Sequence, residues 1–356
     1  MALGRIGTGL IEEIRQPEEN TKRINRRTFV LGAAAAEIAA PSIARAAEPR
    51  YMPGLVAFLT LSAESLATGD IAEARLHFDR AIALYNRTEC RPLASRFGVD
   101  AGVSILTYRS WALWFLGYPK AALTDVDDAI RDAREIGQAA TLVYALGLTS
   151  MSHVFFGNYA AASAQSDEVV AWADEKGALF YKGRGMLTGG CVSAVTDKAA
   201  DAVQMITSGI TARRSTGATL NEPLYLAYLA KAHSDLGQLD DAWRCIDEAI
   251  RTTETTNEGL WEAEVNRIAG EIACKSPERD AAKAEARFER ALAVARGQQA
   301  KSFELRAAMS LARLWRDQGK PQQARELLAP VYGWFTEGFD TRDLKEAKTL
   351  LDELGL

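Results

Sequence analysis

The stretch GDIAEARLHFDRA, residues 69–81, contains the spacing that decides the fold. A turn-forming glycine, Gly69, is followed by Ala74, then by Phe78 four residues later and by Ala81 three residues after that. Spacings of four and three place these last three side chains on one stripe of a helix. The glycine supplies the positive φ with which one helix ends before the next begins. The stretch therefore predicts a turn followed by a helix with a small, apolar packing face.

The same spacing returns along the rest of the chain, and its central alanine recurs at intervals of 48, 40, 40, 40, 42 and 40 residues. The seven copies of this alanine are Ala74, Ala122, Ala162, Ala202, Ala242, Ala284 and Ala324. The turn positions five residues earlier hold Gly69, Gly117, Gly157, Asp197, Gly237, Arg279 and Gly319. The apolar positions four residues later hold Phe78, Val126, Ile206, Ile246, Phe288 and Leu328, and the third copy has Ser166 there. A period of this length predicts stacked supersecondary units.

A second series of turn residues lies between the copies. It consists of Gly137, Gly177, Gly217, Asn257 and Gly297, each 40 residues after the last. Glycine and asparagine both accept the left-handed conformation that ends a helix, so each unit is predicted to be a pair of helices. Alternation with a period of two is nearly absent, and no sheet is expected. We predict an all-α, right-handed superhelix of about seven helix pairs over residues 51–356.

The repeated pattern G-x-x-x-x-A-x-x-x-F-x-x-A resembles the tetratricopeptide repeat (TPR), a helix-turn-helix unit that stacks into arrays. The 40-residue period exceeds the usual 34, which indicates longer helices or loops. Stretches such as YRSWALWFLGYP (residues 108–119) and KAEARFERALAVAR (residues 283–296) resemble the C-terminal repeats of bacterial class III adenylate/guanylate cyclases. This resemblance covers residues 55–356. It implies a regulatory tail, because cyclase and P-loop ATPase domains precede such repeats in that family.

No motif for catalysis is present in the sequence. It contains no G-x-x-x-x-G-K-[ST] loop to hold nucleotide phosphates, and no H-E-x-x-H or G-x-S-x-G. The adjacent Asp127 and Asp128 point in different directions on a helix and are interpreted as a solvated face, not a metal site. His153 and His233 lie two periods apart and are interpreted as packing residues, and His77 has no partner motif. We predict no catalytic residue, no metal and no cofactor.

Composition excludes several classes of partner and site. The chain has 48% hydrophobic and 25% charged residues, as in ordinary globular proteins. Its net charge of −5 argues against a nucleic-acid partner. The four cysteines are far apart, without a C-x-x-C pair, and are interpreted as small buried helix residues. They are Cys90, Cys191, Cys245 and Cys274.

The N-terminal region resembles a twin-arginine (Tat) export signal. Arg26 and Arg27 are followed by a phenylalanine, an alanine-rich apolar stretch and a small-residue cleavage site after Ala46. The resemblance implies export to the periplasm. The apolar stretch is too short, and is interrupted by Glu37, to form a stable membrane span. The alternative is a cytoplasmic protein in which residues 28–47 form a first helix of the array.

A binding groove is expected along the first helix of each unit, which faces the concave side in TPR arrays. Counting back from each turn residue at helical spacing predicts a groove that is aromatic at one end and basic at the other. Its residues are Trp111, Trp114, Tyr144, Met151, Arg184, Leu187, Lys231, Arg306, Met309, Arg313 and Arg316. Aromatic and arginine side chains dominate binding hot spots, so a peptide with an apolar anchor and an acidic end is the expected ligand. Alternatively, the tryptophans fill the core and the arginines are solvated.

The end of the chain is predicted to close the array. Asp340 is the expected N-cap of a helix over about residues 341–354. Its apolar side comprises Leu344, Ala347, Leu350, Leu351 and Leu354, and its charged side comprises Arg342, Lys345, Glu346, Lys348 and Glu353. A charged outer face stops further stacking and keeps a solenoid soluble.

Together these patterns predict a leader at residues 1–46 and a repeat domain at residues 51–356. The expected function is a non-catalytic scaffold or regulatory module that binds a protein or peptide. Two other functions stay open. One is the regulatory fragment of a nucleotide cyclase without its catalytic domain, and the other is a sensor that holds a small ligand between repeats.

Overall fold

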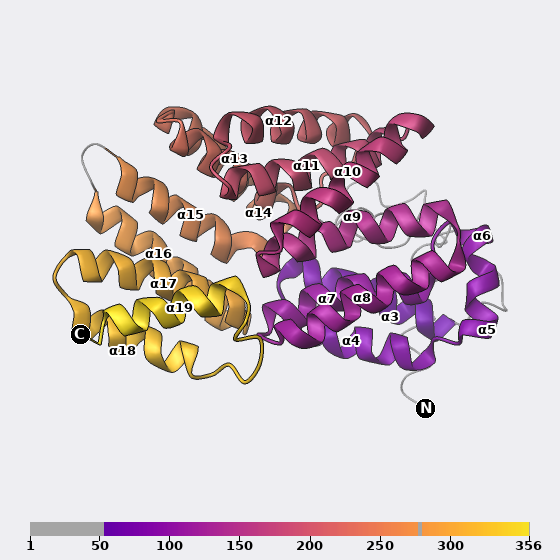
Figure 1. The fold of residues 1–356 in the computed structure, drawn as a ribbon, viewed down its shortest axis with the longest axis horizontal. Coiled ribbons are helices and arrows are strands. Elements are labelled where there is room, and N and C mark those ends of the chain that lie inside the picture. The colour runs from indigo at the N-terminus through magenta and orange to yellow at the C-terminus, as the bar shows by residue number, and fades with distance from the viewer. Residues whose placement is uncertain (1–52, 277–279, 356) are drawn as a thin grey trace, which may run out of the picture.

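Helices joined by short turns make up nearly all of the computed structural model, which describes residues 53–276 and 280–355 (Figure 1). Arg26, Arg27 and the cleavage site after Ala46 lie outside the described residues, as does the turn residue Arg279. Within the described ranges no strand occurs.

The helices form seven consecutive pairs, which we call units one to seven. The pairs are α3 (Pro53–Thr68) with α4 (Ile71–Leu84), α7 (Ala101–Phe115) with α8 (Pro119–Ile136), α9 (Ala139–Phe156) with α10 (Tyr159–Lys176), α11 (Leu179–Val195) with α12 (Ala199–Ser215), α13 (Glu222–Asp235) with α14 (Leu239–Thr256), α15 (Glu262–Lys275) with α16 (Ala281–Gly297), and α17 (Lys301–Asp317) with α18 (Pro321–Tyr332). The prediction of about seven helix pairs is confirmed.

The sequence period is also the packing period. The central alanine is 0% exposed in all seven units. A side chain at Gly190 on α11 would lie 2.5 Å from Ile206 on α12, so a small residue on the first helix lets the second approach closely. Even the exceptional Ser166 of unit three is buried at the position that is apolar elsewhere. Each helix pair is thus held together by a seam of small residues.

The turns have the left-handed backbone expected of them, with one exception. Gly69, Gly117, Gly157, Asp197, Gly237 and Gly319 have φ between 58° and 90°, as do Gly137, Gly177, Gly217 and Asn257. The prediction for Gly297 is wrong, because α16 continues through it and the left-handed residue is Gln299, with φ 56°. The intervening Gln298 donates a side-chain hydrogen bond to the carbonyl of Gly259 at 2.7 Å. This contact holds the turn beyond the predicted position.

Two short segments depart from the simple repeat. Between α4 and α7 the chain forms α5 (Arg87–Cys90), η2 (Arg91–Leu93) and α6 (Ala94–Phe97), which accounts for the first interval of 48 residues. A second 3₁₀ turn, η3 (Gly259–Trp261), precedes α15.

The chain ends in α19 (Arg342–Glu353), which packs on α17 and α18. The predicted N-cap Asp340 is wrong by one residue. The helix begins after Thr341, whose carbonyl accepts from the amide of Lys345 at 3.1 Å, while its hydroxyl donates to the carbonyl of Gly338 at 2.7 Å. Its inward residues Leu344, Ala347, Leu350 and Leu354 are buried as expected, and Leu351 is partly buried.

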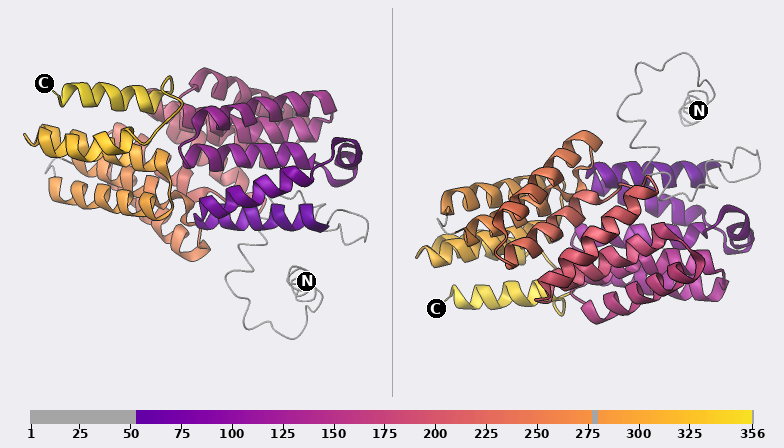
Figure 2. Two further views of the ribbon diagram at one scale, coloured as in Figure 1. Left: turned by 90° about the horizontal axis from the view of Figure 1, so that it is seen from below. Right: turned by 90° about the horizontal axis from the view of Figure 1, so that it is seen from above.

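The array curves until its last unit reaches its early units. Figure 1 shows α17 and α19 next to the ends of α7 and α8, and Figure 2 shows the same meeting from two other sides. Most of the buried apolar side chains of the described residues belong to a large cluster that spans Leu55 to Phe303 and to a second that spans Ala273 to Leu354, with two small clusters around Val103 and Val143. The predicted groove residues Trp111 and Trp114 belong to the large cluster, and Met309 belongs to the second.

One described helix, α9, is long and apolar enough to cross a membrane by length and composition. However, 83% of this helix is buried inside the array. Its apolar character is explained by packing against α7, α8, α10 and α11 on several sides.

Candidate protein-binding surfaces

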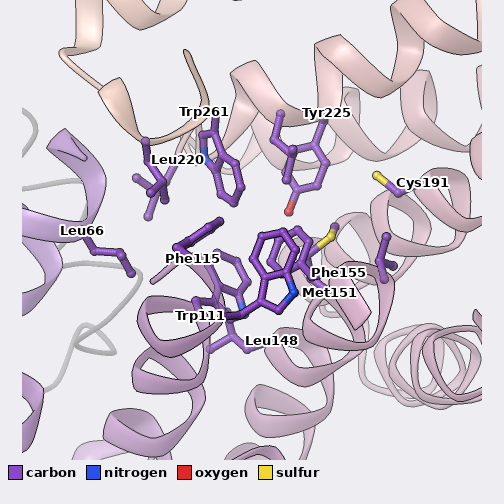
Figure 3. Packing of buried hydrophobic residues seen from close by; sticks show 14 of the residues in the cluster. Leu66, Trp111, Phe115, Leu148, Met151, Phe155, Cys191, Leu220, Tyr225 and Trp261 are labelled. Atoms are coloured by element: carbon purple, nitrogen blue, oxygen red, sulfur yellow. The ribbon is translucent and has the colours of Figure 1, made fainter. Parts of the chain in front are cut away.

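The aromatic end of the predicted groove is filled. Trp111 and Trp114 are only 2% and 3% exposed, so they do not line an open surface in this structure. They belong to a group that we call the central aromatic cluster, which consists of Trp111, Trp114, Phe115, Phe155, Trp261 and Phe303. Figure 3 shows four of these residues, Trp111, Phe115, Phe155 and Trp261. The cluster is built from four units, and Phe303 reaches it from α17 of the last one. The alternative that the tryptophans fill the core is the one that the structure supports.

The rings of the cluster pack at close range. The ring centroids of Trp114 and Phe155 are 4.9 Å apart, those of Phe115 and Phe303 5.1 Å, and those of Trp111 and Trp261 5.9 Å. The buried indole N–H of Trp111 donates to Ser152 Oγ at 3.0 Å, as buried tryptophans require. Aromatic pairs of this kind add about 0.5–1.5 kcal/mol each beyond their buried area, so Phe303 fastens the last unit to the early ones.

Arg306 is the polar centre of this closure. Its guanidinium donates to the carbonyl of Phe155 at 3.0 Å, binds Asp343 at 2.6 Å and lies 4.8 Å from the ring centroid of Trp114. Glu264 lies 3.7 Å away and also binds Arg267 at 2.7 Å. Burial by itself would lower the pKa of Arg306, but Asp343 and Glu264 raise it above its usual range. Arg306 is therefore a charged tie across the array and not an open binding residue.

A carboxylate makes a second tie. Glu337 Oε1 accepts hydrogen bonds from the backbone amides of Lys120 at 3.0 Å and Ala121 at 3.1 Å. These amides open α8, where free N–H groups and the helix dipole favour a negative charge. The Ser302 hydroxyl donates to the carbonyl of Trp114 close by. We call the contacts of Ser302, Arg306 and Glu337 with the early units the clasp.

The turns of units two and three show how closely the last unit approaches. A side chain at Gly117 would lie 2.9 Å from Lys301 Cβ, and one at Gly157 would lie 2.7 Å from Arg342 Cβ. No atom lies within 4 Å of a side chain built at Gly177, a turn on the other edge of the array. Gly117 and Gly157 thus have two roles. They adopt the left-handed backbone of the turn, and their lack of a side chain lets the last unit and α19 approach closely.

The remaining predicted groove residues are also engaged. Tyr144 shares a hydrogen bond with Ser104 at 2.8 Å, and Met151, Leu187 and Met309 are buried. Arg184 is buried across α9, where its Cδ lies 2.7 Å from the place of a side chain at Gly147. Lys231 pairs with Asp235 at 2.8 Å and Arg313 with Glu346 at 3.2 Å, while Arg316 pairs with Glu353 and Asp317. The expected basic end of the groove therefore forms ion pairs, and its three arginines, Arg306, Arg313 and Arg316, all pair with acids of α19.

A buried acid lies beside the start of α13. Glu258 accepts a hydrogen bond at 2.8 Å from the amide of Asn221, a residue with φ 66°, and Asn221 Oδ1 accepts from the indole of Trp261 at 3.0 Å. Burial raises the pKa of Glu258 to about 7, although Asn221 and Arg213 oppose the shift. Burial also lowers the pKa of Arg213. The repeat pattern contains no signal for this group, because it lies in the turns between units.

The candidate chemical residues of the sequence behave as structural residues. His153 is buried with its ring 6.3 Å from that of Phe156, and His233 bonds Gln238 at 2.7 Å. Asp127 is exposed, as predicted for a solvated face. The four cysteines are free, two buried and two partly buried. Among the described residues no group of His, Cys, Asp and Glu could hold a metal ion.

A concave surface is open between α18 and α19. It encloses about 390 Å³, and we call it the C-terminal groove. It is lined by Arg325, Ala329, Tyr332, Lys348, Leu351, Asp352 and Gly355. Phe339, which is 47% exposed, lies with its ring 5.9 Å from that of Tyr332. The sequence interpretation missed this groove, because it treated α19 only as a charged cap.

Comparisons with known proteins agree with this architecture. No family model matches the chain. An uncharacterized protein of Rhizobium meliloti (strain 1021) is 25% identical over 235 residues, which covers 65% of this chain and 23% of that protein. The chain therefore spans less than a quarter of the length of this relative.

Two solved structures are similar over most of the chain. The apo form of RapI has a TM-score of 0.51 at 10% identity and covers 84% of this chain and 99% of its own. Aspartyl phosphate phosphatase F from Bacillus subtilis has a TM-score of 0.54 at 12% identity, with 96% and 90% covered. At these identities the likeness concerns the fold alone. The chain is a TPR-like helical-repeat array, with seven units in its described residues.

Proposed function

We propose that this protein is a non-catalytic scaffold that binds a segment of a partner protein on its inner face. In the closed array, Ser302, Phe303 and Arg306 of α17 and Glu337 of the loop before α19 occupy part of that face. The observation that carries the proposal is the clasp. In the clasp, the guanidinium of Arg306 binds a backbone carbonyl and the carboxylate of Glu337 binds the first amides of a helix. Beside the clasp, Phe303 enters the central aromatic cluster.

These are the contacts by which helical grooves recognise peptide segments. A partner segment that offers an aromatic residue and a carboxylate at similar spacing would compete with the clasp. Because the clasp is intramolecular, it acts at an effective concentration in about the millimolar range. Only molecules in which the clasp is open would bind the partner. The apparent affinity would therefore be the intrinsic affinity multiplied by the fraction of molecules that are open. Weakening the clasp should therefore strengthen binding.

The chain supplies its own probe for this test. The loop peptide GWFTEGFDTRDLK, residues 333–345, contains Trp334 and Glu337, which contact the turn and first amides of unit two. The double variant Trp334→Ala with Glu337→Ala removes these side chains from the intact protein. We expect the labelled peptide to bind this variant at least tenfold more tightly than the unaltered chain, in fluorescence anisotropy.

Two controls make the result specific. Glu289→Ala changes an exposed acid of α16 and should leave peptide binding at the level of the unaltered chain. A scrambled peptide should bind neither protein. If the double variant keeps its helical circular-dichroism spectrum but fails to bind the loop peptide, the inner face is not a peptide site.

A second function rests on the sequence resemblance to the repeats of adenylate/guanylate cyclases. Since this chain matches only 23% of the Rhizobium meliloti protein, the same repeats can form part of a larger protein. We propose, following the sequence resemblance, that such a protein is a nucleotide cyclase and that the repeats regulate it. The purified chain should then make no cyclic nucleotide from ATP or GTP. Turnover by the chain alone would contradict both functions.

A further inference from the structure

The last described helix has the position of a first helix in a unit. The first helices of units six and seven begin at residues 262 and 301, and α19 begins at 342, so the two intervals are 39 and 41 residues. In each of the seven units, the second helix packs against the first helix of its own unit and against the first helix that follows it in the chain. No described helix fills this position next to α19. The C-terminal groove lies there, between α18 and α19.

The floor of the C-terminal groove is apolar. Ala329 and Tyr332 line it from α18, and Leu351 lines it from α19. Phe339 extends this surface from the preceding loop. Ala329 is small, and the larger Tyr332 and Leu351 lie around it. A surface of this shape accommodates the side chains of a packed helix. The groove therefore fits a helix with an apolar stripe at spacings of three and four.

The rim of the groove has an excess of positive charge. Arg325 and Lys348 stand on it against one acid, Asp352, which already pairs with Lys348. Gly355 leaves room for the Arg325 guanidinium above the end of α19. A carboxylate on an incoming helix would meet Arg325 without having to displace an acid there. This charge favours an acidic partner over a basic one.

We propose that the C-terminal groove binds an acidic amphipathic helix of a partner protein, which takes the place of the second helix of an eighth unit. This site is independent of the inner face, because none of the residues lining the groove makes a clasp contact. The bound helix would run antiparallel to α19, as the second helix of each unit does to the first. Its apolar stripe would cover Leu351 and Tyr332.

The probe is a peptide with the sequence of α14, residues 239–256. It is a second helix of this array, its packing residues are Ala242, Ile246 and Ala249, and it carries five acids against two arginines. Its Trp243 reports binding by fluorescence when the protein tryptophans are subtracted. We expect the peptide to bind the intact protein with a dissociation constant in about the micromolar range.

Three substitutions locate the binding. Leu351→Lys in the groove and Ile246→Asp in the peptide should each weaken binding at least tenfold, and Arg325→Glu should weaken it several-fold. The matched control is Leu236→Lys, at an exposed leucine of the turn after α13. It should leave binding unchanged.

Two outcomes would overturn the proposal. One is peptide binding that is indifferent to Leu351→Lys, measured on a variant that keeps its helical spectrum. The other is a self-association of the intact protein that Leu351→Lys abolishes, because the groove would then belong to a second copy. Neither outcome affects the loop-peptide test of the inner face, so the two proposals can fail separately.

Discussion

Arg306 in α17 donates a hydrogen bond to the carbonyl oxygen of Phe155 in α9 at 3.0 Å, across 151 residues of sequence. The same guanidinium binds Asp343 of α19. One side chain thus joins the third unit, the seventh unit and the terminal helix. Because Arg306 is charged and mostly shielded from water, with 14% of its side chain exposed, its removal leaves its acidic partner without a counter-charge.

Arg306→Met should therefore lower the free energy of unfolding by about 3 kcal/mol in urea titrations, the usual cost of breaking a buried ion pair from one side. Asp343→Asn added to Arg306→Met should recover part of the loss. The control is Arg313→Met, about two turns along the same face. Its pair with Glu346 is half exposed and should contribute less than about 1 kcal/mol. Equal losses for the two arginines would contradict the clasp.

The alanine seam makes a second prediction. Ala202→Leu places a large side chain between α11 and α12, where the alanine is fully buried. Overpacking of this kind costs about 1–3 kcal/mol, and we expect the upper part of that range because the neighbouring units resist a shift. Ala200→Leu, on the exposed side of the same helix, should change stability by less than about 0.5 kcal/mol. Thermal unfolding of both variants decides the matter.

The pKa of Glu258 predicts a pH dependence. Burial raises it from 4.5 to about 7, so the folded state holds a proton that the unfolded state releases. The stability that this group contributes is present below pH 4.5 and is lost as the pH rises through about 7. The difference between the two pKa values of Glu258 corresponds to about 3 kcal/mol in the free energy of unfolding. Arg213, Glu222 and Asn221 are the groups that face it.

Glu258→Gln keeps an acceptor for the amide of Asn221 without the charge. The variant should match the unaltered protein near pH 4.5 and exceed it at pH 8, by up to about 3 kcal/mol. Denaturant unfolding at the two pH values measures the difference. A variant that is less stable than the unaltered protein at pH 8 would show that the charged form is favoured by the fold.

Glu337 should protect the start of α8. Glu337→Ala removes the acceptor of the amides of Lys120 and Ala121, and loss of a helix cap costs about 1 kcal/mol. Hydrogen exchange at these two amides should accelerate, while the first turn of α12, which has no such contact from the last unit, should keep its rate. Unchanged exchange at both amides would mean that the clasp is open in solution.

Export stays a prediction, because Arg26 and Arg27 lie outside the described residues. If the twin-arginine pattern acts, the mature protein in a bacterial periplasm begins at Ala47, and replacing both arginines by lysine keeps the full chain in the cytoplasm. N-terminal sequencing of the two forms measures this. An intact N-terminus on the unaltered chain would instead favour the alternative that residues 28–47 belong to the array.

The repeating unit could be predicted almost completely from the sequence. Helix pairing depends on residues close together in the chain, such as Gly117, Ala122 and Val126, whose spacing specifies both the turn and the packing stripe. The errors are local as well. At Gly297 and Asp340 a residue one or two positions later, Gln299 or Thr341, takes the predicted role. Beside the first of these turns, Gln298 contacts Gly259, a contact that lies outside the repeat pattern.

The candidate surfaces could not be predicted in this way. The interpretation of Trp111, Trp114 and Arg306 as groove residues correctly placed them on the first helices, but assumed that nothing else occupies the concave side. Whether it is occupied depends on the small rotation between successive units, added over seven of them. The sequence of a single repeat therefore does not reveal whether the concave side is occupied.

The sequence by itself therefore determined the helix pair, its length, its turns and the number of its copies, because these follow from contacts within one period. Only the tertiary structure decided that the array closes on itself and that α19 leaves a groove at its end. Both features bring together residues such as Phe155 and Arg306, which are far apart in the chain. Their meeting depends on the accumulated curvature and not on any local pattern.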